Sequence, residues 1–177
     1  MAEQIVIHNI QELEVYKKTI FMNLDRNIQQ IKCVIDTCDT LDVFKAFKFD
    51  KIAIEPLSGN QENLIEVINQ VQTYLVSIMA VEHLYQLFPM QEFIINWGNI
   101  PGYDIESFDG AIIAECFSAT SYKSNGKLTS DLKRLSNESS ATYKYIFFYD
   151  KEFTDNHKSY YKEKYPDVEI IKFMDIH

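Results

Sequence analysis

Two carboxylates, Asp104 and Glu115, stand in adjacent apolar runs within the stretch GYDIESFDGAIIAECFSAT, residues 102–120. The dipeptide Asp109–Gly110 between the runs favours a two-residue hairpin turn. In the register that this turn sets, Asp104 lies directly opposite Glu115. A symmetric four-residue loop gives the same pairs, whereas a three-residue loop shifts them by one residue.

Opposed carboxylates in a buried hairpin indicate a site for a cation. Directly opposed residues have Cβ atoms about 4.5–5.5 Å apart, and like charges at that distance repel. In a run as apolar as AIIAECF this is costly unless a cation bridges the pair or one acid is protonated. Paired oxygen ligands suit Mg²⁺ or Mn²⁺, so we expect one of these metals at Asp104 and Glu115. The alternative is that Asp104 lies in water and that Glu115 pairs with a Lys or Arg of a neighbouring helix.

The elements that must position this pair follow from the spacing of apolar residues. Residues 10–37 have apolar side chains every three or four positions, which predicts a long amphipathic surface helix. A core helix is predicted from residue 60 to just before Pro89, and Glu66 lies on its polar stripe. The rest predicts three strands, a helix, a strand, a helix and a strand, at 92–97, 103–108, 111–120, 127–139, 143–150, 157–165 and 168–176.

The connector between the first two helices, residues 38–60, is predicted to contain little regular structure. The segment TLDVFKAF predicts a helical turn, and DKIAIEPLSGN predicts an extended piece that ends at Pro56 and Gly59. Ser58 or Asn60 is expected to cap the helix that follows.

This pattern resembles the PD-(D/E)XK nuclease superfamily, which has the restriction-endonuclease-like fold. The family has an α, βββ, α, β core, and the order of elements over roughly residues 60–173 is similar to it. As in that core, an acid lies in one strand and a second acid follows about ten residues later in the next strand. A helix that carries an acid precedes them, and a helix and a strand follow. The resemblance implies that Asp104 and Glu115 bind the metal and that Glu66 is an additional acid of the site. It also implies an α/β fold with a small mixed sheet flanked by helices.

The chain departs from the family at the motif Lys, which the family places two residues after the second acid. Position 117 is Phe here, and Phe117 shares a strand face with Glu115. An aromatic ring therefore lies where the ammonium group normally points. Lys127, in the first turn of the next helix, is the candidate substitute, and Lys123 in the preceding loop is another. Either one of them reaches the site or hydrolysis has been lost.

Composition narrows the possible functions. The net charge of −9 disfavours non-specific contact with a phosphate backbone, so any DNA contact requires a local patch, a metal or a partner. One small basic cluster is present: Lys123, Lys127, Lys133 and Arg134. The four His show no metal-ligand spacing, and no dinucleotide, P-loop, esterase or zincin motif occurs. With three unpaired Cys and no signal or membrane-length run, we expect a cytoplasmic protein.

We therefore expect one α/β domain over residues 1–177, with an N-terminal helical extension (1–59) and a nuclease-like core (60–177). The predicted function is Mg²⁺- or Mn²⁺-dependent hydrolysis of DNA. The alternative is a catalytically inactive scaffold that binds a protein partner or forms a homodimer through the helix 10–37, which should then expose an apolar stripe. A weaker alternative is a component of a larger defence complex in which another subunit contacts the DNA.

Overall fold

The computed structural model describes residues 3–98 and 100–176, and the chain forms two compact units. The helical unit is Gln11–Gln72, and the sheet unit consists of the N-terminal strand and the chain from Thr73 onward. The division falls inside helix α3 (Leu64–Leu87).

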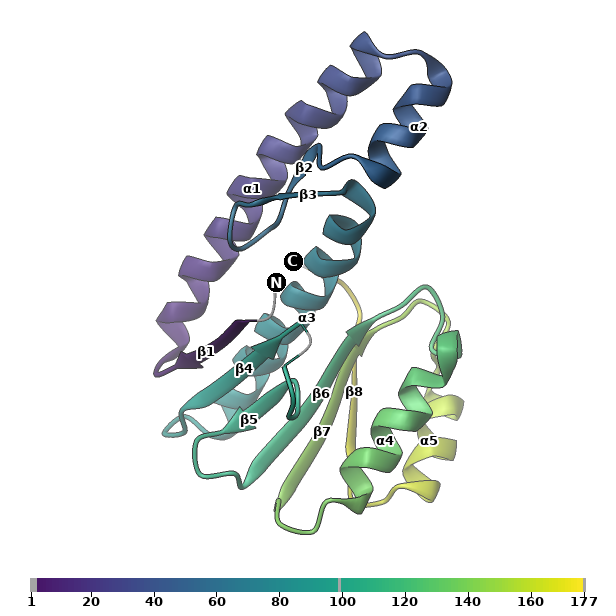
Figure 1. Ribbon diagram of the computed structural model, residues 1–177. Helices are drawn as coiled ribbons and strands as arrows, with labels where there is room; N and C mark the ends of the chain where they lie inside the picture. The colour runs from purple at the N-terminus through teal and green to yellow at the C-terminus, as the bar shows by residue number, and fades with distance from the viewer. Residues whose placement is uncertain (1–2, 99, 177) are drawn as a thin grey trace. The chain divides into compact units, whose positions relative to one another are not determined.

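The sheet unit is built on a mixed six-stranded sheet with the order β1-β4-β5-β6-β7-β8 (Figure 1). Each of β1, β4 and β5 is antiparallel to the next strand in this order, and β6, β7 and β8 are mutually parallel. The expected α/β class with a mixed sheet is confirmed. The strands are β1 (Glu3–Ile7), β4 (Phe93–Trp97), β5 (Ile105–Ser107), β6 (Ile112–Ser118), β7 (Tyr143–Tyr149) and β8 (Glu169–Phe173).

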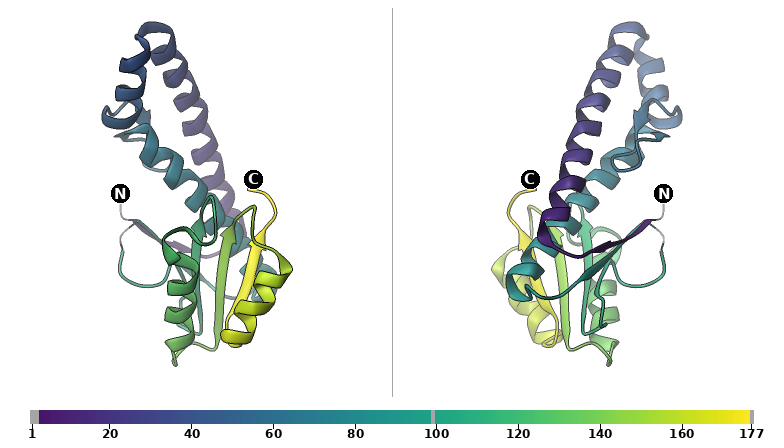
Figure 2. Two further views of the ribbon diagram at one scale, coloured as in Figure 1. Left: turned by 90° about the vertical axis from the view of Figure 1, so that its right-hand side faces the viewer. Right: turned by 90° about the vertical axis from the view of Figure 1, so that its left-hand side faces the viewer.

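Helices cover both faces of this sheet. Helices α4 (Lys127–Asn137) and α5 (Asp155–Lys164) lie on one face, and the part of α3 that belongs to the sheet unit lies on the other (Figures 1 and 2). Because β6 and β7 are buried on both faces, their sequences are almost continuously apolar. Side chains on the α4 face form one hydrophobic cluster, which includes Ile113, Phe117, Leu128, Leu132, Leu135, Ile146 and Phe148.

Two features of these elements differ from the prediction. Strand β1 was not predicted; it pairs with β4 along its whole length and buries Ile5 and Ile7. Helix α3 begins at Leu64, where the Glu66 N–H donates a 3.0 Å hydrogen bond to Asn63 Oδ1. Asn63 therefore caps the helix, and the predicted caps Ser58 and Asn60 lie outside it.

The helical unit contains α1 (Ile10–Thr37), which has the bounds predicted from the sequence. The predicted helical turn is a ten-residue helix, α2 (Thr40–Phe49), and the extended piece forms a short hairpin of β2 (Ala53–Ile54) and β3 (Gln61–Glu62). A small apolar cluster of Ala53, Leu64 and Val67 packs beneath them.

Buried amides of α1 take the place of a neighbouring strand for β2. Asn27 Oδ1 accepts a 2.6 Å hydrogen bond from the Ile54 N–H, and Asn27 Nδ2 donates at 2.8 Å to the Ile54 carbonyl. Asn23 Nδ2 donates at 2.9 Å to the carbonyl of Pro56. Because β2 has a strand neighbour on one side only, these bonds satisfy backbone groups that burial would otherwise leave unpaired.

Helix α3 is long and apolar enough, by length and composition alone, to cross a membrane. Most of its apolar window is buried inside the protein, as in the core helix of a soluble protein. This is therefore weak support for a membrane span.

The amide bridge of Asn27 leads to a stability prediction. Asn27→Leu keeps the volume but leaves the Ile54 N–H and C=O buried without partners, at a cost of about 1–3 kcal/mol for each group. Urea unfolding followed by circular dichroism should show that loss, while Gln11→Leu, at an exposed amide of the same helix, should change little. Equal stability of the two variants would mean that the bridge does not hold β2.

Candidate functional site

The hairpin between β5 and β6 has the register predicted from the sequence. Ile105 pairs with Ala114 and Glu106 with Ile113, so the next opposed pair is Asp104 with Glu115. The connecting loop spans four residues, 108–111, rather than two. It keeps the register because a symmetric four-residue loop opposes the same residues as the predicted turn.

Asp104 and Glu115 are in direct contact. Asp104 Oδ2 accepts a 2.7 Å hydrogen bond from the Cys116 N–H, which extends the β5–β6 ladder through a side chain. Glu115 is only 2% exposed. Burial, followed by the charge of Asp104 and a hydrogen bond to it, raises the pKa of Glu115 to about 9. With this pKa Glu115 is protonated at neutral pH and donates a hydrogen bond to Asp104.

Arg134 of α4 partly offsets this repulsion. Its Nη1 lies 2.7 Å from Glu115 Oε1 and lowers the pKa of Glu115, although less than burial and Asp104 raise it. The same guanidinium donates a hydrogen bond to the Gly102 carbonyl and stacks 4.4 Å from the centre of the Tyr103 ring. The neighbouring-helix cation that the sequence left as an alternative is thus present alongside the opposed acids.

The loop that carries the Gly102 carbonyl depends on glycine. Gly102 has φ +124, and a Cβ there would lie 2.6 Å from Glu106 Oε1. That oxygen accepts a 3.0 Å hydrogen bond from the Tyr103 N–H, which fixes the loop just before Asp104. A side chain at position 102 would disturb the position of Asp104 and the contact to Arg134.

Lys127 lies where the sequence suggested a substitute for the motif Lys. Its Nζ is 5.8 Å from the centre of the Phe117 ring and forms a 2.8 Å ion pair with Asp131. Burial lowers the pKa of Lys127, but Asp131, Asp104 and Glu115 together outweigh burial and raise it. The amine therefore remains protonated and acts as a fixed positive charge rather than as a base.

Phe117 is a core residue beside this charge. It is 4% exposed and stacks on Phe148 at 5.1 Å between ring centres. Cys116 points to the opposite face, is fully enclosed, and has its pKa raised by burial. A buried protonated thiol is a poor nucleophile, so Cys116 belongs to the core.

The structure brings together Asp104, Glu115 and Lys127, but not every predicted residue. Lys123 is exposed and lies 5.5 Å from the Tyr122 ring centre. Glu66 belongs to the helical unit, where it is exposed in the first turn of α3. Asp131 was missed, although its i, i+4 spacing to Lys127 was a usable signal. The contact of Arg134 with Glu115 had no signal in the sequence, since it depends on how α4 packs on β6.

The donor set of this site suits a hard divalent cation only in part. Asp104 and Glu115 supply adjacent oxygen ligands, and the raised pKa of Glu115 indicates that an added positive charge is favourable there. The guanidinium of Arg134 supplies that positive charge, and a metal could bind Glu115 only after Arg134 has moved away from it. Within the ranges 3–98 and 100–176, no three His, Cys, Asp or Glu side chains are grouped to hold a metal. A bound Mg²⁺ would thus take its other ligands from water or substrate.

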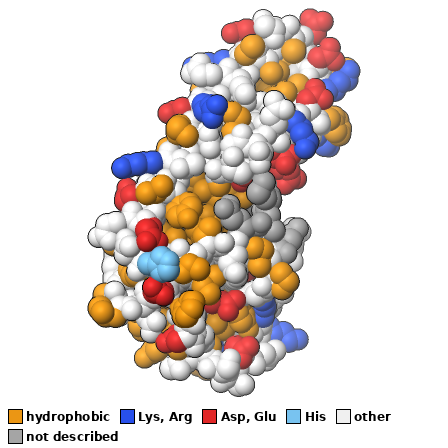
Figure 3. All heavy atoms as spheres, turned by 60° about the vertical axis from the view of Figure 1, so that its left-hand side comes forward, with side chains coloured by type: hydrophobic (Ala, Val, Ile, Leu, Met, Phe, Trp, Pro, Cys, Tyr) orange, Lys and Arg blue, Asp and Glu red, His pale blue; other side chains and the backbone are white. Residues whose placement is uncertain are grey.

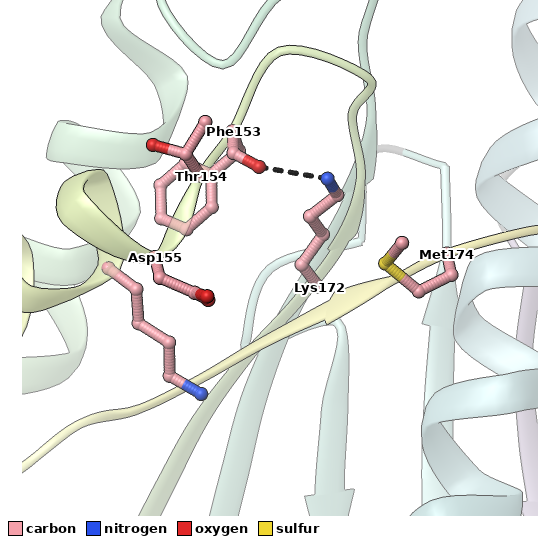
Figure 4. Close-up of a pocket in the computed structure, with 6 residues that line it drawn as sticks. Phe153, Thr154, Asp155, Lys172 and Met174 are labelled. Atoms are coloured by element: carbon pink, nitrogen blue, oxygen red, sulfur yellow. Dashed lines mark hydrogen bonds between the residues drawn. The ribbon is translucent and has the colours of Figure 1, made fainter.

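A second concave feature lies beside the start of α5 and has a volume of about 360 Å³. It is lined by Phe153, Thr154, Asp155, Lys158, Lys172 and Met174, and Lys172 Nζ donates a 2.8 Å hydrogen bond to the Phe153 carbonyl (Figure 4). It contains none of the predicted site residues.

Comparison with known proteins identifies no relative: no family, no curated protein and no solved structure matches this chain. The function must therefore be inferred from the geometry of the site.

The raised pKa of Glu115 predicts how stability depends on pH. Its pKa is about 9 in the folded protein and 4.5 ordinarily, so the folded state binds an extra proton between these values. The free energy of unfolding should be highest near pH 5 and fall as the pH rises toward 9, at about 1.4 kcal/mol per pH unit or less. Urea midpoints measured across this range test the slope.

Glu115→Gln should flatten this dependence, because the amide cannot ionise. Glu163→Gln, at an exposed site on α5, is the control and should leave the slope unchanged. If wild type and Glu115→Gln have parallel profiles, Glu115 is ionised throughout and its ion pair with Arg134 dominates.

Proposed function

We propose that the sheet unit is a divalent-metal-dependent nuclease that hydrolyses DNA phosphodiester bonds. The observation that carries the proposal is the direct contact of Asp104 with Glu115 beside the charged amine of Lys127. The order α3, β4, β5, β6, α4, β7, with β7 parallel to β6, agrees with a restriction-endonuclease-like core. The order of these elements was expected from the resemblance to the PD-(D/E)XK superfamily, and the contact of the two acids from the register of the hairpin.

The proposed roles follow from position and charge. Asp104 and Glu115 would hold Mg²⁺ or Mn²⁺, after Glu115 has lost its proton and Arg134 has moved away. When bound, the metal would stabilise developing negative charge and lower the pKa of a water. Lys127, which stays protonated, would orient the attacked phosphate by binding one of its oxygens. The buried Phe117 ring excludes water beneath the amine and so strengthens its field.

The distribution of charge supports an approach of DNA from the α4 side. Residues 123–177 contain ten Lys or Arg and nine Asp or Glu, whereas residues 1–122 contain seven Lys or Arg and 17 Asp or Glu. No Lys or Arg occurs at all between residues 52 and 122. Positive groups that could contact phosphates near the acid pair, such as Lys123 and Lys133, therefore come from α4 and the loop before it.

Glu66 enters the proposal through the resemblance alone. In the PD-(D/E)XK superfamily many members carry an additional acid of the site on the corresponding helix. Substitution of Glu66 is a weaker test than that of Asp104 or Lys127, because its assignment does not rest on a distance to the acid pair.

A second candidate is a nuclease-like scaffold without catalysis. Arg134 already contacts Glu115, and Phe117 fills the position of the motif Lys. The exposed apolar side chains expected for an interaction helix are also present on α1: Val15, Phe21, Met22, Ile28 and Ile35. These features favour binding of a macromolecular partner over chemistry.

The decisive experiment separates metal binding from chemistry by substitution. In calorimetric titrations with Mg²⁺ and Mn²⁺, wild type should bind, and more tightly at pH 8.5 than at pH 6.5, because binding displaces the proton from Glu115. Asp104→Asn should lose both metal binding and plasmid cleavage. Lys127→Met should still bind the metal but cleave at least about a hundred-fold more slowly.

Glu163→Gln serves as the control for a change of one acid, and circular dichroism verifies that each variant is folded. Lys127→Arg, which keeps the charge, should retain part of the cleavage activity. A wild-type protein that neither binds the metals nor cuts DNA would reject the nuclease and leave the scaffold.

A further inference from the structure

The exposed face of α1 carries large apolar side chains at a fixed interval. Phe21, Ile28 and Ile35 recur every seven residues, and they are 46%, 49% and 55% exposed. Because seven residues are close to two helical turns, the three side chains lie in one stripe. An exposed apolar stripe of this kind marks a surface that binds another macromolecule.

Charged residues are interleaved with this stripe in a second series of seven. Lys18, Asp25 and Lys32 alternate in sign, and together with the apolar series they follow the three-and-four spacing of a coiled-coil seam. All three are exposed, and none belongs to an ion pair in the part of the chain that the structure describes. On the surface of the helical unit, hydrophobic side chains lie between charged ones (Figure 3). We call these six residues, Lys18, Phe21, Asp25, Ile28, Lys32 and Ile35, the α1 seam.

We propose that the α1 seam binds a second copy of this chain in antiparallel orientation, about a two-fold axis near Ile28. In that arrangement Lys32 of each copy meets Asp25 of the other. The apolar series is also self-complementary, since Ile28 lies on the axis and Phe21 faces Ile35. The two charges nearest the axis therefore each meet a charge of opposite sign.

The alternation of sign selects both the partner and its direction. A parallel pair in register would oppose Lys with Lys and Asp with Asp, which is unfavourable. The two charges nearest the axis, Asp25 and Lys32, are complementary to the same pair read in the opposite direction. Binding of an unrelated partner does not require this property. An isologous interface, in which the same surface meets itself across a two-fold axis, does need such a pattern.

The apolar and charged series should contribute differently to the dimer. The seam extends from Lys18 to Ile35, about 25 Å of helix, so its apolar side chains can form a continuous contact. Exposed ion pairs add little affinity but penalise wrong orientations. We therefore expect removal of an apolar side chain to abolish the dimer, and reversal of a charge to weaken it.

Analytical ultracentrifugation of the full chain tests the assembly. Wild type should form a dimer, and Ile28→Asp should be monomeric while remaining helical, because Ile28 is exposed. Asp25→Lys should raise the dissociation constant about tenfold or more, since it places like charges together twice across the axis. The double variant Asp25→Lys with Lys32→Asp should restore the dissociation constant of wild type. Asp50→Lys, the same charge change outside the seam, should leave the dissociation constant unchanged.

Disulfide trapping tests the orientation. In a background of Cys33→Ser and Cys38→Ser, which removes both exposed thiols, Ile28→Cys should cross-link to itself on oxidation. Phe21→Cys alone should not cross-link, but mixed with Ile35→Cys it should give a covalent heterodimer. The proposal is overturned by a monomeric wild type, by self-linking of Phe21→Cys, or by a dimer that Ile28→Asp and Asp25→Lys leave intact.

Discussion

The contact between two carboxyl groups within a buried hairpin is the constraint on which the sheet unit depends. Asp104 and Glu115 are forced together by the β5–β6 register, and water is almost excluded from Glu115. Repulsion that bulk water would screen must then be relieved locally. The raised pKa of Glu115, which keeps its carboxyl protonated at neutral pH, and the nearby Arg134 guanidinium relieve it. A divalent cation would relieve it more completely.

Helix α4 supplies the groups that respond to this constraint, and it does so while packing on the sheet. Lys127, Asp131 and Arg134 follow one another at steps of four and three, so they share one face of the helix. Each is followed directly by a leucine that packs into the core: Leu128, Leu132 and Leu135. The burial of the leucines therefore fixes where the three charged side chains can reach. One helix thus contributes stability and the polar part of the site.

In the helical unit, buried polar side chains of α1 form hydrogen bonds with the backbone of a neighbouring segment. Asn23 and Asn27 of α1 hold an irregular segment whose backbone would otherwise be buried without partners. The side of α1 that carries them is fixed by these bonds, which leaves the α1 seam facing outward. The same helix can therefore organise its own unit on one side and present a patterned surface on the other.

The sequence by itself determined the elements whose signals are local and regular. The bounds of α1 followed from a period sustained over 28 residues, and the register of Asp104 with Glu115 followed from a turn dipeptide between two apolar runs. Strand β1 could not be found in this way, because a short edge strand is defined by its partner β4 rather than by its own sequence. The cap of α3 was misplaced among several residues of equal capping propensity.

Only the tertiary structure decided what surrounds the acid pair. The sequence offered Lys127 as the substitute for the motif Lys and Lys123 as another, and the packing of α4 on β6 placed Lys127 over Phe117. The same packing brought Arg134 to Glu115 across 19 residues of chain. The sequence thus specified that two carboxylates would meet. Which cation meets them depends on distances between elements, because electrostatic energies vary steeply with separation and burial, and neither quantity is encoded in residue spacing.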